Sequence, residues 1–354
     1  MGNLQFTEQP LSDWMNRDGN ESNIVISTRV RIARNLVEYP FPILATNQQS
    51  EEVLNKFEEV LNDERMKPFG KLHPIELADL DDLDKQVLVE KHLISPSLVT
   101  ESRNGAAFIS DDESLSIMVN EEDHLRIQCL YPGLQVKEAW DKASAVDDIF
   151  EDHVDYAFDD KRGYLTSCPT NVGTGLRASV MIHLPALALT HQIGRILSAV
   201  TQVGLAVRGI YGEGSETVGN LFQISNQITL GQSESEIIDN LYGVVVQIIE
   251  HEKAAREKLL SDSRIRIMDR IMRSYGTLSY AAVIDSKEAA QRLSDVRLGV
   301  DLGFITVPLH ALNELNVMTQ PGFLQKKQGG NMSPGERDIF RAKVIREHLE
   351  DNVQ

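Results

Sequence analysis

Short apolar segments along the chain predict six strands. Most are runs of about four to eight residues bounded by polar turns, a pattern typical of buried strands, and the first alternates apolar and polar positions. Three of them follow one another with only turns between, which predicts an antiparallel meander. The predicted strands cover residues 23–32, 106–109, 115–119, 125–130, 205–210 and 221–230.

Apolar residues at helical spacing predict long helices beside these strands. In residues 50–62 and 137–156, apolar side chains recur every three or four positions, so they would share one face. Residues 184–203 predict another long helix, in which Pro185 occupies a tolerated first-turn position. Antiparallel strands with helices gathered beside them predict an α+β fold rather than a doubly wound parallel sheet.

The last third of the chain has a different pattern. Residues 233–236, Ser-Glu-Ser-Glu, form a capping box that opens a helix predicted to end near residue 260. Beyond that point the pattern predicts short helices, with loops at Gly276, Gly299 and residues 320–332 and a final helix over residues 334–350. We therefore expect two domains, a mixed α/β domain over 1–260 and a helical domain over 261–354.

Composition and charge exclude several classes of protein. The chain has 35 Lys and Arg against 53 Asp and Glu, a net charge of −18, which argues against direct binding of nucleic acid or anionic membranes. It contains no apolar run long enough to span a membrane, and its first residues do not resemble a secretory signal. Cys129 and Cys168 form neither a disulfide framework nor a zinc motif. We expect a cytoplasmic protein without a metal site of its own.

Two arginines on the first predicted strand are candidates for anion binding. Arg29 and Arg31 lie two residues apart, so their side chains would point to the same side of the sheet. Two like charges on one face are unfavourable unless an anion lies between them. The alternative is an exposed strand face with solvated arginines.

Polar turns and glycine-rich loops supply further candidates. Residues 120–126 read Asn-Glu-Glu-Asp-His-Leu-Arg, which alone could be a solvated turn. Gly173 and Gly175 predict a tight loop whose N–H groups could bind an anion, although no Walker A lysine follows. Residues 208–216 predict a second glycine-rich loop. Alone, each loop could be ordinary, as Cys168 could be a buried apolar residue.

Four motifs in this order resemble those of the phosphagen kinases, which include the creatine and arginine kinases. They are Ser-x-Arg-x-Arg from residue 27, Asn-Glu-Glu-Asp-His-Leu-Arg from 120, Cys-Pro-Thr-Asn-x-Gly-Thr-Gly-x-Arg from 168 and Arg-Gly-x-x-Gly-Glu from 208. Only 26 residues precede the first motif, and a helical region of about 90 residues follows the last. Phosphagen kinases instead carry a helical domain before the first motif and end shortly after the catalytic domain. In both respects this chain resembles the bacterial protein-arginine kinases of the McsB family, and it is identified as a member.

The resemblance implies transfer of the γ-phosphoryl group of ATP, carried with Mg²⁺, to a guanidinium nitrogen of arginine in proteins. Guanidinium groups suit such a site because they bind phosphate oxygens in pairs and keep their charge. Glu122 and Glu213 match the family's paired carboxylates, with Glu122 preferred as the base, and Cys168 would add a thiolate beside the substrate. The expected catalytic residues are Glu122, Glu213, Cys168, Arg126, Arg177 and Arg208.

The resemblance also implies a nucleotide site and an allosteric site. The allosteric site would bind phosphoarginine on the last helix, with the alternative that its arginines are an ordinary charged surface. Its residues would be Arg337, Asp338, Arg341 and Ala342. The nucleotide site would comprise Ser27, Thr28, Arg29, Val30, Arg31, His92, Arg126, Arg177, Ala178, Ser179, Val180, Met181, Arg208, Gly209, Ile210, Tyr211, Gly212 and Glu213.

The family further implies a cellular role and partners. Arginine phosphorylation would mark proteins for regulated proteolysis and control a stress response. The expected partners are the activator McsA, the repressor CtsR and the ClpC–ClpP protease, and the helical domain would form a homodimer. Two alternatives stay open: a phosphagen kinase acting on a free guanidine compound, and a catalytically silent adaptor that binds phosphoarginine.

Overall fold

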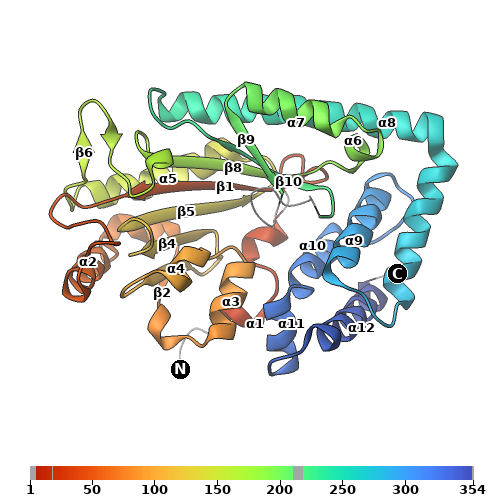
Figure 1. Ribbon diagram of the computed structural model, residues 1–354, viewed down its shortest axis with the longest axis horizontal. Coiled ribbons are helices and arrows are strands. Elements are labelled where there is room, and N and C mark those ends of the chain that lie inside the picture. The colour runs from red at the N-terminus through yellow and green to blue at the C-terminus, as the bar shows by residue number, and fades with distance from the viewer. Residues whose placement is uncertain (1–4, 18, 210–217, 353–354) are drawn as a thin grey trace. The chain divides into compact units, whose positions relative to one another are not determined.

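One eight-stranded sheet organises the fold. The computed structural model describes residues 5–17, 19–209 and 218–352, and its strands lie in the order β2-β3-β4-β5-β1-β8-β10-β9 (Figure 1). A separate hairpin joins β6 (Phe158–Asp159) and β7 (Gly163–Tyr164). The strands of the large sheet are β1 (Val25–Arg34), β2 (Leu72–Glu76), β3 (Ala106–Ser110), β4 (Leu115–Val119), β5 (Leu125–Pro132), β8 (Leu176–His183), β9 (Leu205–Gly209) and β10 (Leu221–Asn226).

The predicted meander and the predicted α+β class are confirmed. β3 pairs with β4, and β4 with β5, in antiparallel register, while β1 pairs antiparallel with the other edge of β5. Residues of β3 and β4 are buried on both faces because layers of helix and chain cover the sheet on each side. In the strand order of the sheet, β1 lies near the centre, between β5 and β8 (Figure 1).

The described residues fall into two compact units. The first comprises Met1–Asn20, Ser27–Val180 and Ser225–Tyr242. In it, α5 packs on β5, and an apolar core joins the N-terminal segment to the sheet through Phe6, Trp14, Leu98 and Met118. Its helices are α1 (Gln5–Glu8), α2 (Asn47–Val60), α3 (Asp82–Glu90), α4 (Pro96–Thr100) and α5 (Val136–Glu151), with short 3-10 turns η1 (Asp13–Asn16), η2 (Glu64–Phe69), η3 (Leu77–Asp79) and η4 (Pro169–Asn171).

The second unit comprises Glu21–Ile26, Met181–Ile224 and Gly243–Gln354. Its main apolar core includes Leu293, Leu312 and Ile345. Its helices are α6 (Pro185–Leu189), α7 (Ile193–Gln202), most of α8 (Glu234–Tyr280), α9 (Ser286–Asp301), α10 (Leu309–Met318), α11 (Pro321–Gln328) and α12 (Pro334–Asn352). The expected boundary at residue 260 stays a prediction.

One predicted helix is divided in the structure, and another is followed by a second helical segment beyond a kink. The predicted helix over 184–203 is two helices, α6 and α7, because His191 adopts a positive φ of 56° that an α-helix does not accommodate. The helix expected to end near residue 260 runs to a kink at Ser263, where the backbone is not helical, and a second helical segment of α8 continues from there to Tyr280. Gly276, expected in a loop, lies inside α8, Gly299 lies inside α9, and α11 occupies most of the loop expected over residues 320–332. Glycine weakens a helix by only about 1 kcal/mol, so packing can override it.

Strand β8 was not predicted from the sequence. Its Leu176, Ala178, Val180 and Ile182 are buried and alternate with more polar residues, so a period of two is present in the sequence. The glycine-rich motif that precedes β8 favours a loop, and it masks the strand pattern that follows. Across the part of the chain that the structure describes, no helix has the length and apolarity needed to cross a bilayer.

Candidate active site

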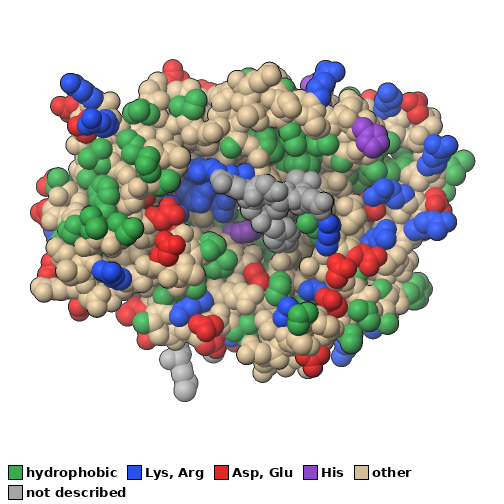
Figure 2. All heavy atoms as spheres, viewed as in Figure 1, with side chains coloured by type: hydrophobic (Ala, Val, Ile, Leu, Met, Phe, Trp, Pro, Cys, Tyr) green, Lys and Arg blue, Asp and Glu red, His purple; other side chains and the backbone are tan. Residues whose placement is uncertain are grey.

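Arginines from three adjacent strands gather on one face of the sheet. Arg126 on β5 is paired in register with Ala33 of β1. It therefore shares a face with Arg31 and Arg29, which lie two and four residues before Ala33. Arg177 on β8 lies close enough to repel both β1 arginines. Figure 2 shows Lys and Arg side chains gathered in a hollow on this face. The predicted pairing of Arg29 with Arg31 is therefore confirmed.

The charges of these arginines oppose one another. Burial, and then the charges of Arg126 and Arg177, lower the pKa of Arg29 to about 10. Burial and the neighbouring arginines also hold the pKa of Arg31 well below its usual value, and Glu121 offsets this only in part. A negatively charged group bound here would relieve the repulsion, which is the property expected of a phosphate site.

The side chains that alternate with these arginines face the core. Thr28 and Val30 on β1 are fully buried, and the Thr28 hydroxyl donates to the carbonyl of Gly133 at 2.7 Å. Ala178 and Val180 on β8 are buried in the same way. These four stay predicted nucleotide-site residues, and any contribution from them would come through the backbone.

The remaining predicted nucleotide-site residues differ in exposure, and Ser179 is buried. The Ser179 hydroxyl donates to the carbonyl of Arg29 at 3.4 Å, while Ser27 and Met181 are partly exposed. Arg208 and Gly209 lie on β9, within the second unit. The predicted residues Ile210, Tyr211, Gly212 and Glu213 lie outside the described residues.

His92 is held next to the β1 arginines in an unusual backbone conformation. Its φ is 60°, and the side-chain amide of Gln128 donates to its carbonyl at 2.7 Å. Partial loss of water around the ring, followed by the charges of Arg29 and Arg31, lowers the pKa of His92 to about 4. Its imidazole is therefore neutral at pH 7 and can stack on or hydrogen-bond to a ligand without adding charge.

The turn between β4 and β5 presents two carboxylates that differ in burial. Glu121 is buried, and its Oε1 accepts from Arg126 Nη1 at 2.6 Å. Glu122 is 37% exposed, and its Oε2 accepts from Arg126 Nη2 at 3.1 Å. Burial is the largest influence on the Glu121 carboxyl and raises its pKa, while Arg126 opposes that shift. Glu122 is thus the carboxylate of the pair that a substrate can reach.

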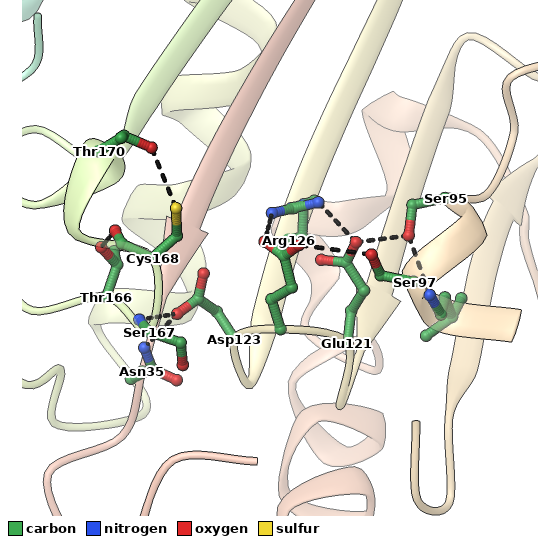
Figure 3. A network of polar contacts seen from close by, with 12 residues as sticks. Asn35, Ser95, Ser97, Glu121, Asp123, Arg126, Thr166, Ser167, Cys168 and Thr170 are labelled. Atoms are coloured by element: carbon green, nitrogen blue, oxygen red, sulfur yellow. Dashed lines mark hydrogen bonds and ion pairs between the residues drawn. The ribbon is translucent and has the colours of Figure 1, made fainter. Parts of the chain in front are cut away.

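Two further polar side chains of this turn, Asp123 and His124, are buried. Asp123 accepts at Oδ1 from the Asn35 side chain and from the Ser167 N–H, each at 2.7 Å (Figure 3). His124 is also buried, and its Nδ1 accepts from the Leu36 N–H at 3.1 Å. The interpretation of residues 120–126 as a solvated turn is therefore wrong for Glu121, Asp123 and His124.

Asp123 also fixes the segment that carries Cys168. The Ser167 amide bonded to Asp123 directly precedes Cys168, whose thiol is partly buried 3.0 Å from the Thr170 hydroxyl. Figure 3 shows the Cys168 segment on one side of Arg126 and the segment with Ser95 and Ser97 on the other. The structure thus brings Glu122, Arg126 and Cys168 into one region of the first unit.

The glycine loop before β8 does not offer its amides to a ligand. The N–H groups of Gly173, Thr174 and Gly175 donate to the carbonyls of Tyr164, Thr229 and Asn171 at 3.0–3.2 Å. A Cβ at Gly173 would lie 2.2 Å from the Thr229 oxygen. The expected anion-binding loop is therefore wrong, because these glycines serve close packing of the backbone.

Comparisons with known proteins decide the family. The family model of the ATP:guanido phosphotransferase C-terminal catalytic domain matches residues 52–255, and that of the protein-arginine kinase McsB C-terminal domain matches residues 264–354. The protein-arginine kinase of Brevibacillus brevis is 61% identical over 350 residues, which span 99% of this chain and 98% of that protein. The chain belongs to the protein-arginine kinase family. Another family member, from Bacillus subtilis, is 55% identical over 98% of this chain and 96% of its own length.

Two solved structures share the fold of this chain. A lombricine kinase matches with a TM-score of 0.59 and 23% identity, over 72% of each chain. The duplicated taurocyamine kinase of Schistosoma mansoni, bound to transition-state analogue components, matches with a TM-score of 0.60 and 23% identity, over 77% of this chain and 39% of that one. At this identity the likeness establishes the shared fold.

The predicted phosphoarginine residues of the family lie on α12. Arg341 is buried, and its guanidinium donates to the carbonyls of Thr319 and Ile284 at 3.0 Å each and pairs with Asp338. Arg337 is partly buried and donates to the Met332 carbonyl at 2.8 Å. Ala342 packs in the core. The structure brings Arg341 and Asp338 together and gives Arg341 a structural role, while the allosteric role stays a prediction.

Sequence reasoning missed the residues that hold the site in place. Ser95 and Ser97 contact the two carboxylates, Asn35 holds Asp123, and Arg34 pairs with buried Asp147 at 2.6 Å. Ser95 before Pro96 is a recognisable helix start, but nothing in the sequence assigns it a partner 26 residues away. Within the described ranges, no group of three His, Cys, Asp or Glu residues could hold a metal ion.

Proposed function

We propose that this chain transfers the γ-phosphoryl group of ATP to guanidinium nitrogens of arginine side chains in proteins. One observation carries the proposal: four mutually repelling arginines lie beside an exposed carboxylate, Glu122, in a member of the protein-arginine kinase family. The arginines suit a polyphosphate, and the carboxylate suits a guanidinium.

In the proposed reaction, the residues of this chain position the reactants and neutralise charge. Arg29, Arg31, Arg126 and Arg177 would bind the phosphates of ATP, which brings Mg²⁺ with it as part of the substrate. Charge spreads over the equatorial oxygens in the transition state, so these arginines would stabilise it most. Glu122 would hold the incoming guanidinium and accept its proton. Glu213, Arg208 and Cys168 remain proposed members of the site, as in the family.

The test is phosphorylation of a basic protein by γ-labelled ATP. We expect acid-labile label on arginine, and a loss of about a hundredfold or more in kcat for Glu122→Gln, because the acceptor loses its base. Glu51→Gln, at an exposed position on α2, is the control and should keep full activity. Label on free arginine alone would favour a phosphagen kinase, and an active Glu122→Gln would reject the assigned base.

We also propose allosteric activation by phosphoarginine through α12. Arg337 and Asp338 are partly exposed neighbours of opposite charge, which suits a ligand that carries both a phosphoryl and a guanidinium group. Added phosphoarginine should raise the activity of the wild type but not that of Arg337→Ala. Lys343→Ala, on the same helix with 56% of its side chain exposed, should respond like the wild type. Equal activation of all three proteins would reject the site.

The cellular role is proposed from the family. We place the reaction in the cytoplasm, with a catalytic domain over 1–260 and a dimerising, sensing domain over 261–354. Phosphorylation would direct proteins to ClpC–ClpP in a stress response, with McsA as activator and CtsR as a target. Sedimentation of the purified chain tests the homodimer, and degradation of its phosphorylated products by ClpC–ClpP tests the role in proteolysis.

A further inference from the structure

Two serines on one short helix contact the two consecutive carboxylates of the β4–β5 turn. Ser95 caps the N-terminus of α4, where its hydroxyl accepts from the Leu98 N–H at 3.1 Å. The same hydroxyl donates its proton to Oε1 of Glu121. Ser97, two residues further along the chain, donates to Oε1 of Glu122 at 3.3 Å. Figure 3 shows Ser95 and Ser97 both pointing toward this turn.

The short helix is firmly placed, so its serines are fixed donors. Leu98 of α4 is fully buried in the apolar core together with Leu93, Ile94 and Met118. Pro96 occupies the first helical position, where its restricted φ favours the helix start. A serine hydroxyl can accept one hydrogen bond and donate another, which is what Ser95 does here.

Arg126 links the two carboxylates, and each carboxylate then has a second partner on α4. Oε1 of Glu121 receives both Arg126 and Ser95. Glu122 is held at both oxygens, by Arg126 at Oε2 and by Ser97 at Oε1. An exposed carboxylate with two donors on opposite oxygens loses the freedom to rotate, which is the requirement for gripping a planar guanidinium in one orientation.

We infer that Ser95 and Ser97 are positioning residues for phosphoryl transfer, Ser97 by orienting Glu122 and Ser95 by fixing Glu121 and through it Arg126. The inference rests on the proposed function, in which Glu122 accepts the proton of the substrate guanidinium. Both serines would act through the carboxylates that they contact. Their removal should therefore slow the chemical step more than it weakens ATP binding.

The first experiment compares Ser97→Ala with Ser97→Thr and Thr100→Ala. Thr100 is the matched control, because it lies on the same helix and its hydroxyl bonds only the Pro96 carbonyl among the described contacts. We expect Ser97→Ala to lower kcat about fivefold to tenfold with KM for ATP within about twofold, the effect of one lost hydrogen bond of ordinary strength. Ser97→Thr should regain most of the loss, and Thr100→Ala should show none.

The second experiment separates positioning by Ser95 from its helix cap. Glycine is nearly as good a cap as serine, so Ser95→Gly should keep the start of α4 while it removes the hydrogen bond to Glu121. We expect its kcat to fall as for Ser97→Ala. Unchanged kcat in both variants, or an equal loss in Thr100→Ala, would overturn the inference.

A crystal structure of Ser97→Ala gives a readout that does not depend on activity. A Glu122 carboxylate that leaves Arg126 or takes several orientations supports the inference, whereas one that keeps its wild-type position overturns it. Failure of the proposed function would be seen separately, as a wild-type chain that labels no protein arginine.

Discussion

His124 shows how one buried side chain ties stability to pH. Burial lowers the pKa of its ring to about 4 from 6.5, and Nδ1 accepts from Leu36. Between these pH values the unfolded chain binds a proton that the folded chain does not, so stability falls as the pH falls from 6.5 to 4. In His124→Asn this contribution, about 3 kcal/mol at most, should be missing. Urea unfolding at pH 7 and pH 4 measures it, and equal pH dependence in both proteins would contradict the assignment.

Arg126 offers a prediction about geometry rather than charge. Its planar guanidinium reaches Glu121 and Glu122 together, whereas a lysine ammonium is a single point. Arg126→Lys should therefore lower kcat/KM about tenfold to a hundredfold, although the charge is kept. Arg65→Lys is the matched control, because exposed Arg65 also bridges two carboxylates, Asp63 and Asp152. Steady-state kinetics of both variants decide, and comparable losses would remove the special role of Arg126.

At the scale of residues, the sequence predicted groups that share one strand and missed groups that meet across the fold. The period of two placed Arg29 and Arg31 on one face. The partners of Glu122 and Asp123, by contrast, are Ser97 and Asn35, which lie 25 and 88 residues away along the chain. No local pattern encodes such contacts, because they depend on how the sheet is assembled.

Replacing each of two glycines with alanine should change the stability of the protein in opposite directions. Gly276 lies inside α8 with open space around the position of a Cβ, so Gly276→Ala should stabilise the protein by about 0.5–1 kcal/mol. Gly173 has a φ of 115°, and a Cβ there would overlap the Thr229 carbonyl. Gly173→Ala should destabilise by about 2 kcal/mol or more. Chemical denaturation measures both, and a destabilised Gly276→Ala would argue for the loop expected from sequence.

For helices and strands, strong periodicity of apolar residues predicted the element, whereas the break at His191 was not predicted. The meander of β3, β4 and β5 followed from apolar runs separated by turns. The break between α6 and α7 at His191 has no glycine or proline at that position to mark it, whereas the kink of α8 at Ser263 lies close to the helix end predicted near residue 260. The positive φ of His191 ends the helical pattern there, and the spacing of apolar residues does not record it.

For the molecule as a whole, the net charge of −18 predicts a preference among protein substrates. Opposite charge accelerates encounter and is screened by salt. KM for a basic substrate protein should therefore rise about threefold or more between 0.05 and 0.3 M salt at saturating ATP. An acidic substrate protein with accessible arginines is the comparison and should show no such rise. The same salt dependence for both would assign the effect to the ATP site instead.

The arginine cluster has a cost that the fold carries when no anion is bound. Arg31 is disfavoured in its charged form by burial and by three neighbouring arginines. Arg31→Met should raise the unfolding free energy of the nucleotide-free protein by about 1–4 kcal/mol. The same variant should lose most of the rise in melting temperature that ATP gives the wild type. Calorimetry with and without ATP measures both changes, and a destabilised variant would contradict the prediction.

A further consequence concerns which sequences this sheet can tolerate. Selection for stability alone would remove Arg29 and Arg31, since apolar residues of similar size would pack the same face without repulsion. Their presence makes the centre of the sheet a locally frustrated element whose conflict is resolved only when a polyphosphate binds. Variants chosen for heat resistance should therefore accumulate substitutions on this face first, and in doing so become good folders and poor kinases.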